Sequence, residues 1–245
     1  MPERDMAVVL LCGGRGTRAR PHTREVPKPL LEVAGEPVLA HLLRIYAAQG
    51  LTRFVLSAGY LADQVVDFAR TLPSAWDVDV VDTGEDTGTA GRIARVADRV
   101  GDTFLANYAD GLGDVDVAAA LDFHRAHPGT ATVTTVPLPS QYGTIDAGDD
   151  GRVTRFREKP RLTDHRINGG WFVFDRAALD QFVGDDLEQE VLPHLGARGD
   201  LYAYEHHGFW QSMDTYKDAV ALTELAERPD GPPWAVAPTA AAALR

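Results

Sequence analysis

In the first half of the chain, apolar runs of strand length alternate with segments in which apolar residues recur at helical spacing. Apolar runs of strand length occur at four places: residues 7–11, 54–58, 77–81 and 104–106. Segments with apolar residues at helical spacing lie between them: residues 37–50, 61–72 and 89–100. Strands that alternate with helices predict an α/β fold with a mostly parallel sheet. Ligands of such sheets bind beyond the carboxyl ends of the strands.

The second half predicts a different arrangement. Helices are expected at residues 115–127 and 215–227, and strands at residues 130–137, 171–174 and 201–206. Residues 143–157 have the pattern of a hairpin that turns at 149–151. We therefore expect one domain over residues 1–228 with a smaller antiparallel lobe. Residues 229–245 are rich in Pro and Ala and predict an irregular or frayed tail.

Composition limits the function classes. The chain has 245 residues, of which 44% are hydrophobic and 24% charged, as in an ordinary soluble domain. A net charge of −12 argues against a nucleic-acid-binding protein. The single cysteine excludes an internal disulfide. Because neither a signal-peptide pattern nor a membrane-length apolar run is present, we expect a cytoplasmic protein without a membrane partner.

A glycine-rich loop follows the first predicted strand. Gly13, Gly14 and Gly16 let the backbone turn sharply and approach a ligand, and the N–H groups of such a loop can face phosphate oxygens. Arg18 and Lys28 add two positive charges nearby. The combination predicts a polyphosphate-binding site. The alternative is a tight turn without a ligand, which does not require both cations.

Two other phosphate-binding loops fit this stretch poorly. A Walker loop needs Gly-Lys followed by Ser or Thr, and Gly-Lys does not occur in the chain. Gly14, Gly16 and Ala19 satisfy a relaxed dinucleotide fingerprint, which requires a helix to begin within the motif. Three prolines within residues 21–29 break such a helix. A long irregular loop that ends on Lys28 remains.

Two aspartates follow strand-like or turn segments far apart in the sequence. Asp110 comes after the strand at residues 104–106, at the expected mouth of the sheet, and Asp214 directly precedes a predicted helix. Mg²⁺ prefers one or two carboxylates together with phosphate oxygens, so the pair predicts a magnesium site. Each residue alone is more often a turn residue or a helix N-cap, and the place of Asp214 directly before a helix fits the cap.

A second polar group lies near residues 158–170. Glu158 can accept hydrogen bonds from sugar hydroxyls, Lys159 can hold a monophosphate, and Asn168 offers both a donor and an acceptor. Gly169 lets the backbone approach a sugar. The chain has three lysines against 21 arginines, so a lysine kept at position 159 suggests a need for a compact ammonium. The alternative is a surface ion pair followed by a turn.

Residues 87–92 open a helix after a strand. Their backbone can face the edge of a base, with Arg92 donating to a carbonyl of that base; an ordinary helix start explains the same residues. Cys12 is interpreted as a small buried residue and not as a nucleophile. The eight histidines show no metal-ligand spacing.

These motifs together resemble the glucose-1-phosphate cytidylyltransferases, a family of sugar-1-phosphate nucleotidyltransferases. The general pattern is carried by residues 13–18, 27–29 and 158–160. The cytidylyl branch is suggested by residues 81–84, 89–92, 108–111, 167–170 and, most specifically, 208–215. The resemblance implies a Rossmann-like three-layer αβα nucleotidyltransferase fold with a small antiparallel lobe on the sugar side.

The resemblance also implies roles for individual residues. Asp110 and Asp214 match the metal aspartates. Arg18, Lys28 and Asp110 match the catalytic group. The implied nucleotide-binding residues are Leu11, Cys12, Gly13, Gly14, Gly16, Thr17, Arg18, Lys28, Thr89, Gly91 and Arg92. The implied sugar-phosphate-binding residues are Gly143, Glu158, Lys159, Asn168 and Gly169.

The hypothesis from the sequence is an Mg²⁺-dependent enzyme that joins CTP to a sugar 1-phosphate, most simply α-D-glucose 1-phosphate, as a homo-oligomer. The products are a CDP-sugar and pyrophosphate. One alternative keeps the chemistry with dTTP, GTP, another sugar phosphate or a phosphonate, since residues 88–91 also resemble guanylyl enzymes. Another alternative is an inactive regulator that binds nucleotide sugars, and a dehydrogenase is the weakest.

Overall fold

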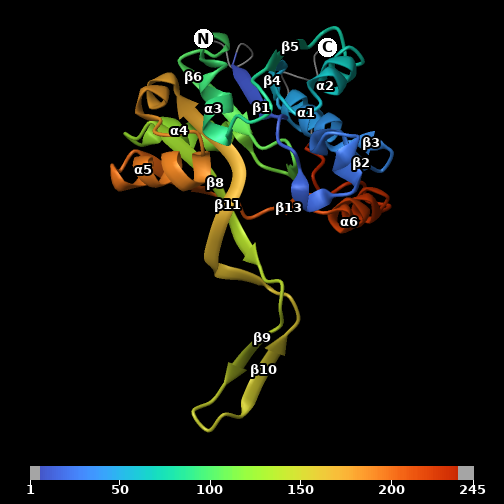
Figure 1. The fold of residues 1–245 in the computed structure, drawn as a ribbon. Coiled ribbons are helices and arrows are strands. Elements are labelled where there is room, and N and C mark those ends of the chain that lie inside the picture. Colours follow the sequence, from blue (N-terminus) through green and yellow to red (C-terminus); the bar gives the residue numbers. More distant parts are fainter. Residues whose placement is uncertain (1–5, 237–245) are drawn as a thin grey trace.

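A seven-stranded sheet forms the centre of the computed structural model, which describes residues 6–236 (Figure 1). Its order is β12-β8-β11-β6-β1-β4-β5. The strands are β1 (Ala7–Leu11), β4 (Arg53–Ala58), β5 (Asp77–Asp82), β6 (Thr103–Asn107), β8 (Ala131–Pro139), β11 (Arg161–Asp175) and β12 (Leu201–Glu205). β11 runs antiparallel to β6 and β8, and the other neighbours pair in parallel. The predicted mostly parallel α/β sheet is confirmed.

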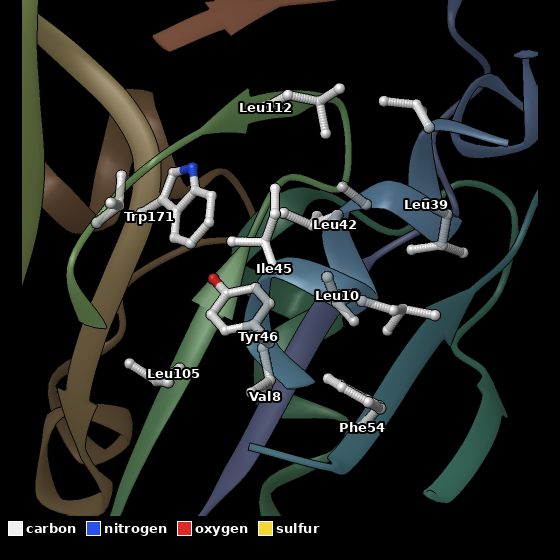
Figure 2. Packing of buried hydrophobic residues seen from close by; sticks show 14 of the residues in the cluster. Val8, Leu10, Leu39, Leu42, Ile45, Tyr46, Phe54, Leu105, Leu112 and Trp171 are labelled. Carbon is white, nitrogen blue, oxygen red and sulfur yellow. The ribbon is translucent and has the colours of Figure 1, made fainter. Parts of the chain in front are cut away.

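Successive residues of the central strands face two separate apolar cores, as the two-residue period of a strand requires. Val8 and Leu10 of β1 face one core, where Figure 2 shows them with Leu42 and Tyr46. The helices of this side are α1 (Val38–Ala48), α2 (Ala62–Ala69), α4 (Val117–Ala126) and α6 (Tyr216–Ala226). Val9 faces the other core, with α3 (Thr89–Ala94), the π-helical turn η7 (Leu187–Val191) and α5 (Leu192–Ala197). The result is the expected three-layer arrangement.

Short elements complete the chain. The 3₁₀ turns are η2 (Thr17–Ala19), η3 (His22–Arg24), η4 (Lys28–Leu30), η5 (Ala97–Arg99) and η6 (Arg176–Gln181). The two-stranded antiparallel sheets pair β2 (Glu32–Val33) with β3 (Glu36–Pro37), β7 (Gly111–Gly113) with β13 (Trp210–Ser212), and β9 (Thr144–Ala147) with β10 (Val153–Arg157). The β9–β10 pair is the predicted hairpin. Figure 1 shows it at the tip of a long extension from β8 and β11, well away from the helices. We call residues 140–160 the arm.

Two elements differ in length from the prediction. β11 runs over 15 residues, although the apolar pattern predicted a strand only at residues 171–174. Its first half is largely exposed and polar, so no alternation marks it. The helix predicted at residues 89–100 ends at Ala94, because Val96 N donates to Ile93 O and tightens the chain into 3₁₀ geometry.

The start of the predicted tail is packed against the domain. Residues 229–236 contain no helix or strand, as expected, but Trp234 is only 2% exposed. Its ring lies against those of Phe209 and His41, so the expectation of a frayed tail is wrong there. The other tail residues, 237–245, lie outside the described residues, and the domain boundary at 228 stays a prediction.

No helix within residues 6–236 is long and apolar enough to cross a membrane. The expected cytoplasmic location stays a prediction.

Candidate active site

Arg92 of α3 holds the glycine loop from behind. The residue is 3% exposed, and its guanidinium donates to Gly13 O at 2.9 Å, to Ala58 O at 3.0 Å and to Thr83 Oγ1 at 2.8 Å. A Cβ at Gly13 would collide with that guanidinium, so the close approach of Arg92 requires the glycine. These bonds favour a structural role for Arg92 in holding the loop, and its predicted contact with a base stays a prediction.

Replacing Arg92 by Ala is expected to destabilise the protein by about 3 kcal/mol, because three hydrogen bonds from a buried charged donor are lost. Arg92→Lys keeps the charge without the planar fork, so it is expected to recover little of that loss. Urea denaturation measures both changes. The control is Arg70→Ala, whose side chain is 73% exposed and which should change the free energy of unfolding by less than about 0.5 kcal/mol. An Arg92→Ala protein as stable as this control would contradict the assignment.

A tight turn after β6 positions Asp110. Ala109 has a φ of 61°, a left-handed conformation that is uncommon for a residue with a Cβ. The side-chain oxygen of buried Asn107 accepts a hydrogen bond from Ala109 N at 2.8 Å, and Tyr108 N donates to Gly170 O at 3.2 Å. These bonds hold the turn, and Asp110 lies beyond the carboxyl end of β6, where the sequence predicts a ligand site.

The pairing of β7 with β13 brings Asp214 close to Asp110. Gly111 of β7 pairs with Ser212 of β13, and Met213 N donates to Asp110 O at 2.8 Å. The two aspartates thus lie at adjacent ends of one small antiparallel sheet.

The start of α6 leaves the carboxylate of Asp214 available. The N-cap is Thr215, whose Oγ1 accepts from Asp218 N at 3.3 Å, while the Asp218 carboxylate accepts from Thr215 N at 2.7 Å. This reciprocal capping box satisfies the helix N-terminus. Asp214 therefore does not act as the cap, the alternative that the sequence left open.

Lys28 of η4 joins the two carboxylates. It is 9% exposed, and its Nζ lies 2.6 Å from Asp110 Oδ2 and 3.1 Å from Asp214 Oδ1. Arg18 of η2 approaches from the solvent side: its Nη2 lies 3.0 Å from Asp214 Oδ1, and its side chain is 74% exposed. Two predicted cations and two predicted metal carboxylates from four segments of the chain thus form one cluster, which we call the carboxylate cluster.

Burial and charge act against each other on the pKa values of this cluster. Burial raises the pKa of Asp110, and the nearby Lys28 only partly opposes this effect. Burial also acts to raise the pKa of Asp214, but Lys28 and Arg18 outweigh it and hold the pKa below its ordinary value. Burial lowers the pKa of Lys28, but the two carboxylates outweigh it and the pKa is raised. Lys28 is therefore charged at neutral pH.

A cavity of about 430 Å³ opens at the carboxylate cluster and the glycine loop. The predicted site residues that line it are Leu11, Gly14, Gly16, Thr17, Arg18, Lys28, Thr89, Arg92 and Asp110. The predicted nucleotide-binding residues that do not line it are Cys12, Gly13 and Gly91. Cys12 is completely buried, and burial raises the pKa of its thiol to about 12, which fits its interpretation as a core residue.

An acidic loop that the sequence analysis missed forms another wall. The Asp185 carbonyl accepts a hydrogen bond from Gly91 N at 3.3 Å, and a Cβ at Gly91 would collide with the Asp185 carboxylate. Thr89 Oγ1 donates to Glu188 Oε2 at 2.8 Å. Asp186 and Glu188 line the cavity. No local pattern distinguishes these acids from ordinary surface residues, so only the packing of η7 on α3 reveals them.

Tyr108 connects the cavity to β11. Its side chain lines the cavity, and its Oη accepts a hydrogen bond from Asn168 Nδ2 at 2.9 Å. The neighbouring Gly169 O accepts from Trp210 Nε1 at 2.8 Å. Two of the predicted sugar-phosphate-binding residues, Asn168 and Gly169, therefore lie just behind the cavity wall, and Tyr108 is the side chain between Asn168 and the cavity.

The other predicted sugar-phosphate-binding residues lie on the arm. Gly143, Glu158 and Lys159 do not line the cavity. Lys159 Nζ is 3.7 Å from Glu158 Oε1, with side chains 59% and 65% exposed. The hairpin of the arm extends away from the sheet (Figure 1), and the predicted contact of these residues with a sugar phosphate stays a prediction.

Comparisons with known proteins agree with the motifs. A family model described as "Nucleotidyl transferase" matches residues 7–226. The glucose-1-phosphate cytidylyltransferase of Salmonella typhi is 37% identical over 253 residues, which cover 93% of this chain and 98% of the relative. The chain belongs to the glucose-1-phosphate cytidylyltransferase family of nucleotidyl transferases. A probable glucose-1-phosphate cytidylyltransferase of Bacillus subtilis is 35% identical to this nucleotidyl transferase, over 90% of this chain and 96% of the relative.

A solved structure supports the fold of this nucleotidyl transferase. HddC from Yersinia pseudotuberculosis superimposes with a TM-score of 0.71, covering 89% of this chain and 98% of that chain. Because the sequence identity is 24%, this likeness supports the fold and carries no conclusion about substrates. The three-layer arrangement around the mostly parallel sheet is therefore the nucleotidyl transferase fold that the motifs implied.

Proposed function

We propose that the protein joins CTP to α-D-glucose 1-phosphate and releases CDP-glucose and pyrophosphate. An oxygen of the sugar phosphate attacks the α-phosphorus of CTP in line, so no covalent enzyme intermediate is needed. The observation that carries the proposal is the meeting of Asp110 and Asp214 on one ammonium, that of Lys28, which lines the cavity of the glycine loop together with Asp110. The choice of CTP and glucose rests on the relatives of Salmonella typhi and Bacillus subtilis.

Asp110 and Asp214 would hold Mg²⁺. Two carboxylate oxygens from different segments already share a single cationic group, Lys28 Nζ, so the donor set fits one small cation. No group of three or more His, Cys, Asp or Glu residues suited to a metal ion occurs within residues 6–236. A site with two protein carboxylates suits Mg²⁺, which completes its coordination with phosphate oxygens and water. When bound, the ion supplies charge neutralisation at the phosphates.

The chain's own residues provide alignment and positive charge. Gly14 and Gly16 line the cavity beside Arg18 and Lys28, and the space around Gly14 is open, which suits a triphosphate. Both cations would stabilise the charge that moves to pyrophosphate as the bond to the α-phosphorus breaks. Thr89 lies on the same cavity near the start of α3 and would contact the nucleoside. Arg92 would act on the nucleotide only indirectly, through the shape of the loop.

We propose that the arm completes the sugar-phosphate site of a second copy of the chain. Glu158 and Lys159 lie at its base, and the apolar side chains of the arm are exposed: Tyr142 77%, Ile145 58%, Val153 55% and Phe156 62%. A two-stranded ribbon with exposed apolar side chains is marginally stable alone and gains burial against another surface. This arrangement would make the protein a homo-oligomer and would place Lys159 beside Asn168 of the partner copy.

Pyrophosphate release across a panel of CTP, dTTP, GTP and ATP with several hexose 1-phosphates tests the proposal. The expected result is Mg²⁺-dependent release that is fastest with CTP and glucose 1-phosphate. Preference for another nucleotide or sugar would keep the chemistry and correct the substrates. Tight nucleotide binding without pyrophosphate release from any pair of nucleotide and sugar phosphate would overturn the proposed reaction. It would favour the alternative of an inactive regulator that binds nucleotide sugars.

A further inference from the structure

Lys28 occupies the space between the two carboxylates that are proposed to bind the metal. Its Nζ contacts Asp110 and Asp214 at 2.6 and 3.1 Å, and its 9% exposure leaves little room for water around the ammonium. A lysine ammonium is a compact point charge, so it can neutralise two carboxylates as a small ion does. The other nearby cation, Arg18, is paired with Asp214 and is largely in solvent.

The carboxylates need a cation whether or not substrate is present. Two carboxylates in one buried site repel each other and disfavour joint ionisation. The same Lys28 lines the cavity next to Gly14 and Gly16, where a triphosphate would offer phosphate oxygens to the ammonium. Its flexible four-carbon stem can reach either set of anions.

We propose that Lys28 is a built-in counter-ion that excludes free divalent metal from Asp110 and Asp214 until a nucleoside triphosphate draws the ammonium away. This inference rests on the proposed function and deepens it, because it sets the order in which the site is filled. Metal and nucleotide then bind with positive coupling. The nucleotide draws the ammonium of Lys28 away from the carboxylates that bind the metal, and the metal frees that ammonium to bind the phosphates. Lys28 thus positions the carboxylates in the free protein and the phosphates in the loaded one.

Binding of Mn²⁺ to the nucleotide-free protein, followed by electron paramagnetic resonance of the free ion, tests the proposal. The wild-type protein is expected to bind Mn²⁺ weakly. Lys28→Gln and Lys28→Met are expected to bind it roughly tenfold more tightly, because the carboxylates lose their internal cation. Lys28→Arg keeps a cation and should stay close to wild type. The double variant Lys28→Gln/Asp214→Asn should lose this increase in Mn²⁺ affinity, because one of the two carboxylates is gone.

Arg18→Gln is the matched control. It removes a positive charge from the same carboxylate, Asp214, but it does not vacate the space between the two carboxylates. A general loss of positive charge would tighten Mn²⁺ binding in Arg18→Gln as much as in Lys28→Gln, and this result would overturn the proposal. Equal Mn²⁺ affinity of the wild-type protein and both neutral Lys28 variants would also overturn it.

Thermal unfolding gives a second readout that does not depend on catalysis. Lys28→Gln should melt below the wild-type protein without metal, and Mg²⁺ should raise its melting temperature more than that of the wild type, because the ion binds only the folded carboxylate pair. A smaller Mg²⁺ shift in Lys28→Gln than in wild type would count against the proposal. Pyrophosphate release by the wild-type protein is measured separately, so failure of the proposed reaction and failure of the counter-ion are distinguishable.

Discussion

Asp110→Asn is expected to lower the turnover of pyrophosphate release roughly 10³-fold while leaving the protein folded. The substitution keeps the shape of the side chain and removes the charge that is proposed to hold the metal against the phosphates. Lys28 would still be paired with Asp214 at 3.1 Å, so no buried ammonium is left without a partner. The free energy of unfolding should therefore fall by no more than about 2 kcal/mol, less than when a buried ion pair loses its sole partner.

A continuous pyrophosphate assay with CTP and glucose 1-phosphate at one saturating Mg²⁺ concentration measures the turnover, and urea denaturation measures the stability. Asp67→Asn is the control, because its side chain is 71% exposed and pairs with Arg70 on the surface, far from the carboxylate cluster in the sequence. It should leave both quantities unchanged. Wild-type turnover in Asp110→Asn would reject the proposed role of the carboxylate cluster.

The residues of the carboxylate cluster could be predicted singly, but their meeting could not. Asp110 follows a strand with a clear apolar pattern, and parallel strands place such residues at the mouth of the sheet. Asp214 reaches the same place through β7 and β13, two strands of three residues each, which are too short to show any period. Their register is visible only in the structure. The resemblance of residues 208–215 to known enzymes supplied the link that periodicity lacks.

The glycine loop shows a different limit. Its glycines and cations predict a phosphate site, and the cavity lies there. The same residue types also serve internal packing: Gly13 admits the Arg92 guanidinium and Gly91 admits Asp185. A sequence does not distinguish a glycine that makes room for a ligand from one that makes room for a side chain. For this reason the sequence does not reveal the structural role of Arg92, or the place of Asp186 and Glu188 in the cavity wall.

The hairpin of the arm was predicted, but its direction was not. Asp149, Asp150 and Gly151 are strong turn residues, and β9 and β10 pair around them. The direction depends on the outer half of β11, which is polar and exposed and therefore has no apolar face that specifies where it packs. The remaining question is whether Lys159 acts at the carboxylate cluster of its own chain or at that of a second copy.

A mixture of two impaired variants tests whether Lys159 serves the carboxylate cluster of its own chain or that of another copy. Lys159→Ala removes the proposed sugar-phosphate contact and should lower kcat/KM for glucose 1-phosphate roughly a hundredfold. Asp110→Asn removes the metal carboxylate and leaves the arm intact. If the arm of one copy serves the cavity of another, co-expressed chains form some sites with Asp110 from one copy and Lys159 from the other. Random pairing in a symmetric oligomer restores roughly a quarter of the sites.

Two controls test whether restored activity in the mixture comes from sites shared between copies. Asp110→Asn mixed with Asp214→Asn should stay inactive, because both changes damage the same side of every site. Ile145→Asp with Phe156→Asp places charges on the exposed apolar face of the arm and should shift the protein toward the monomer in light scattering. Activity of the Lys159→Ala and Asp110→Asn mixture that does not exceed the sum of its parts would mean that each arm folds back onto its own cavity. In that case the monomeric arm variant should keep its activity, whereas a shared site predicts that activity falls together with the oligomer.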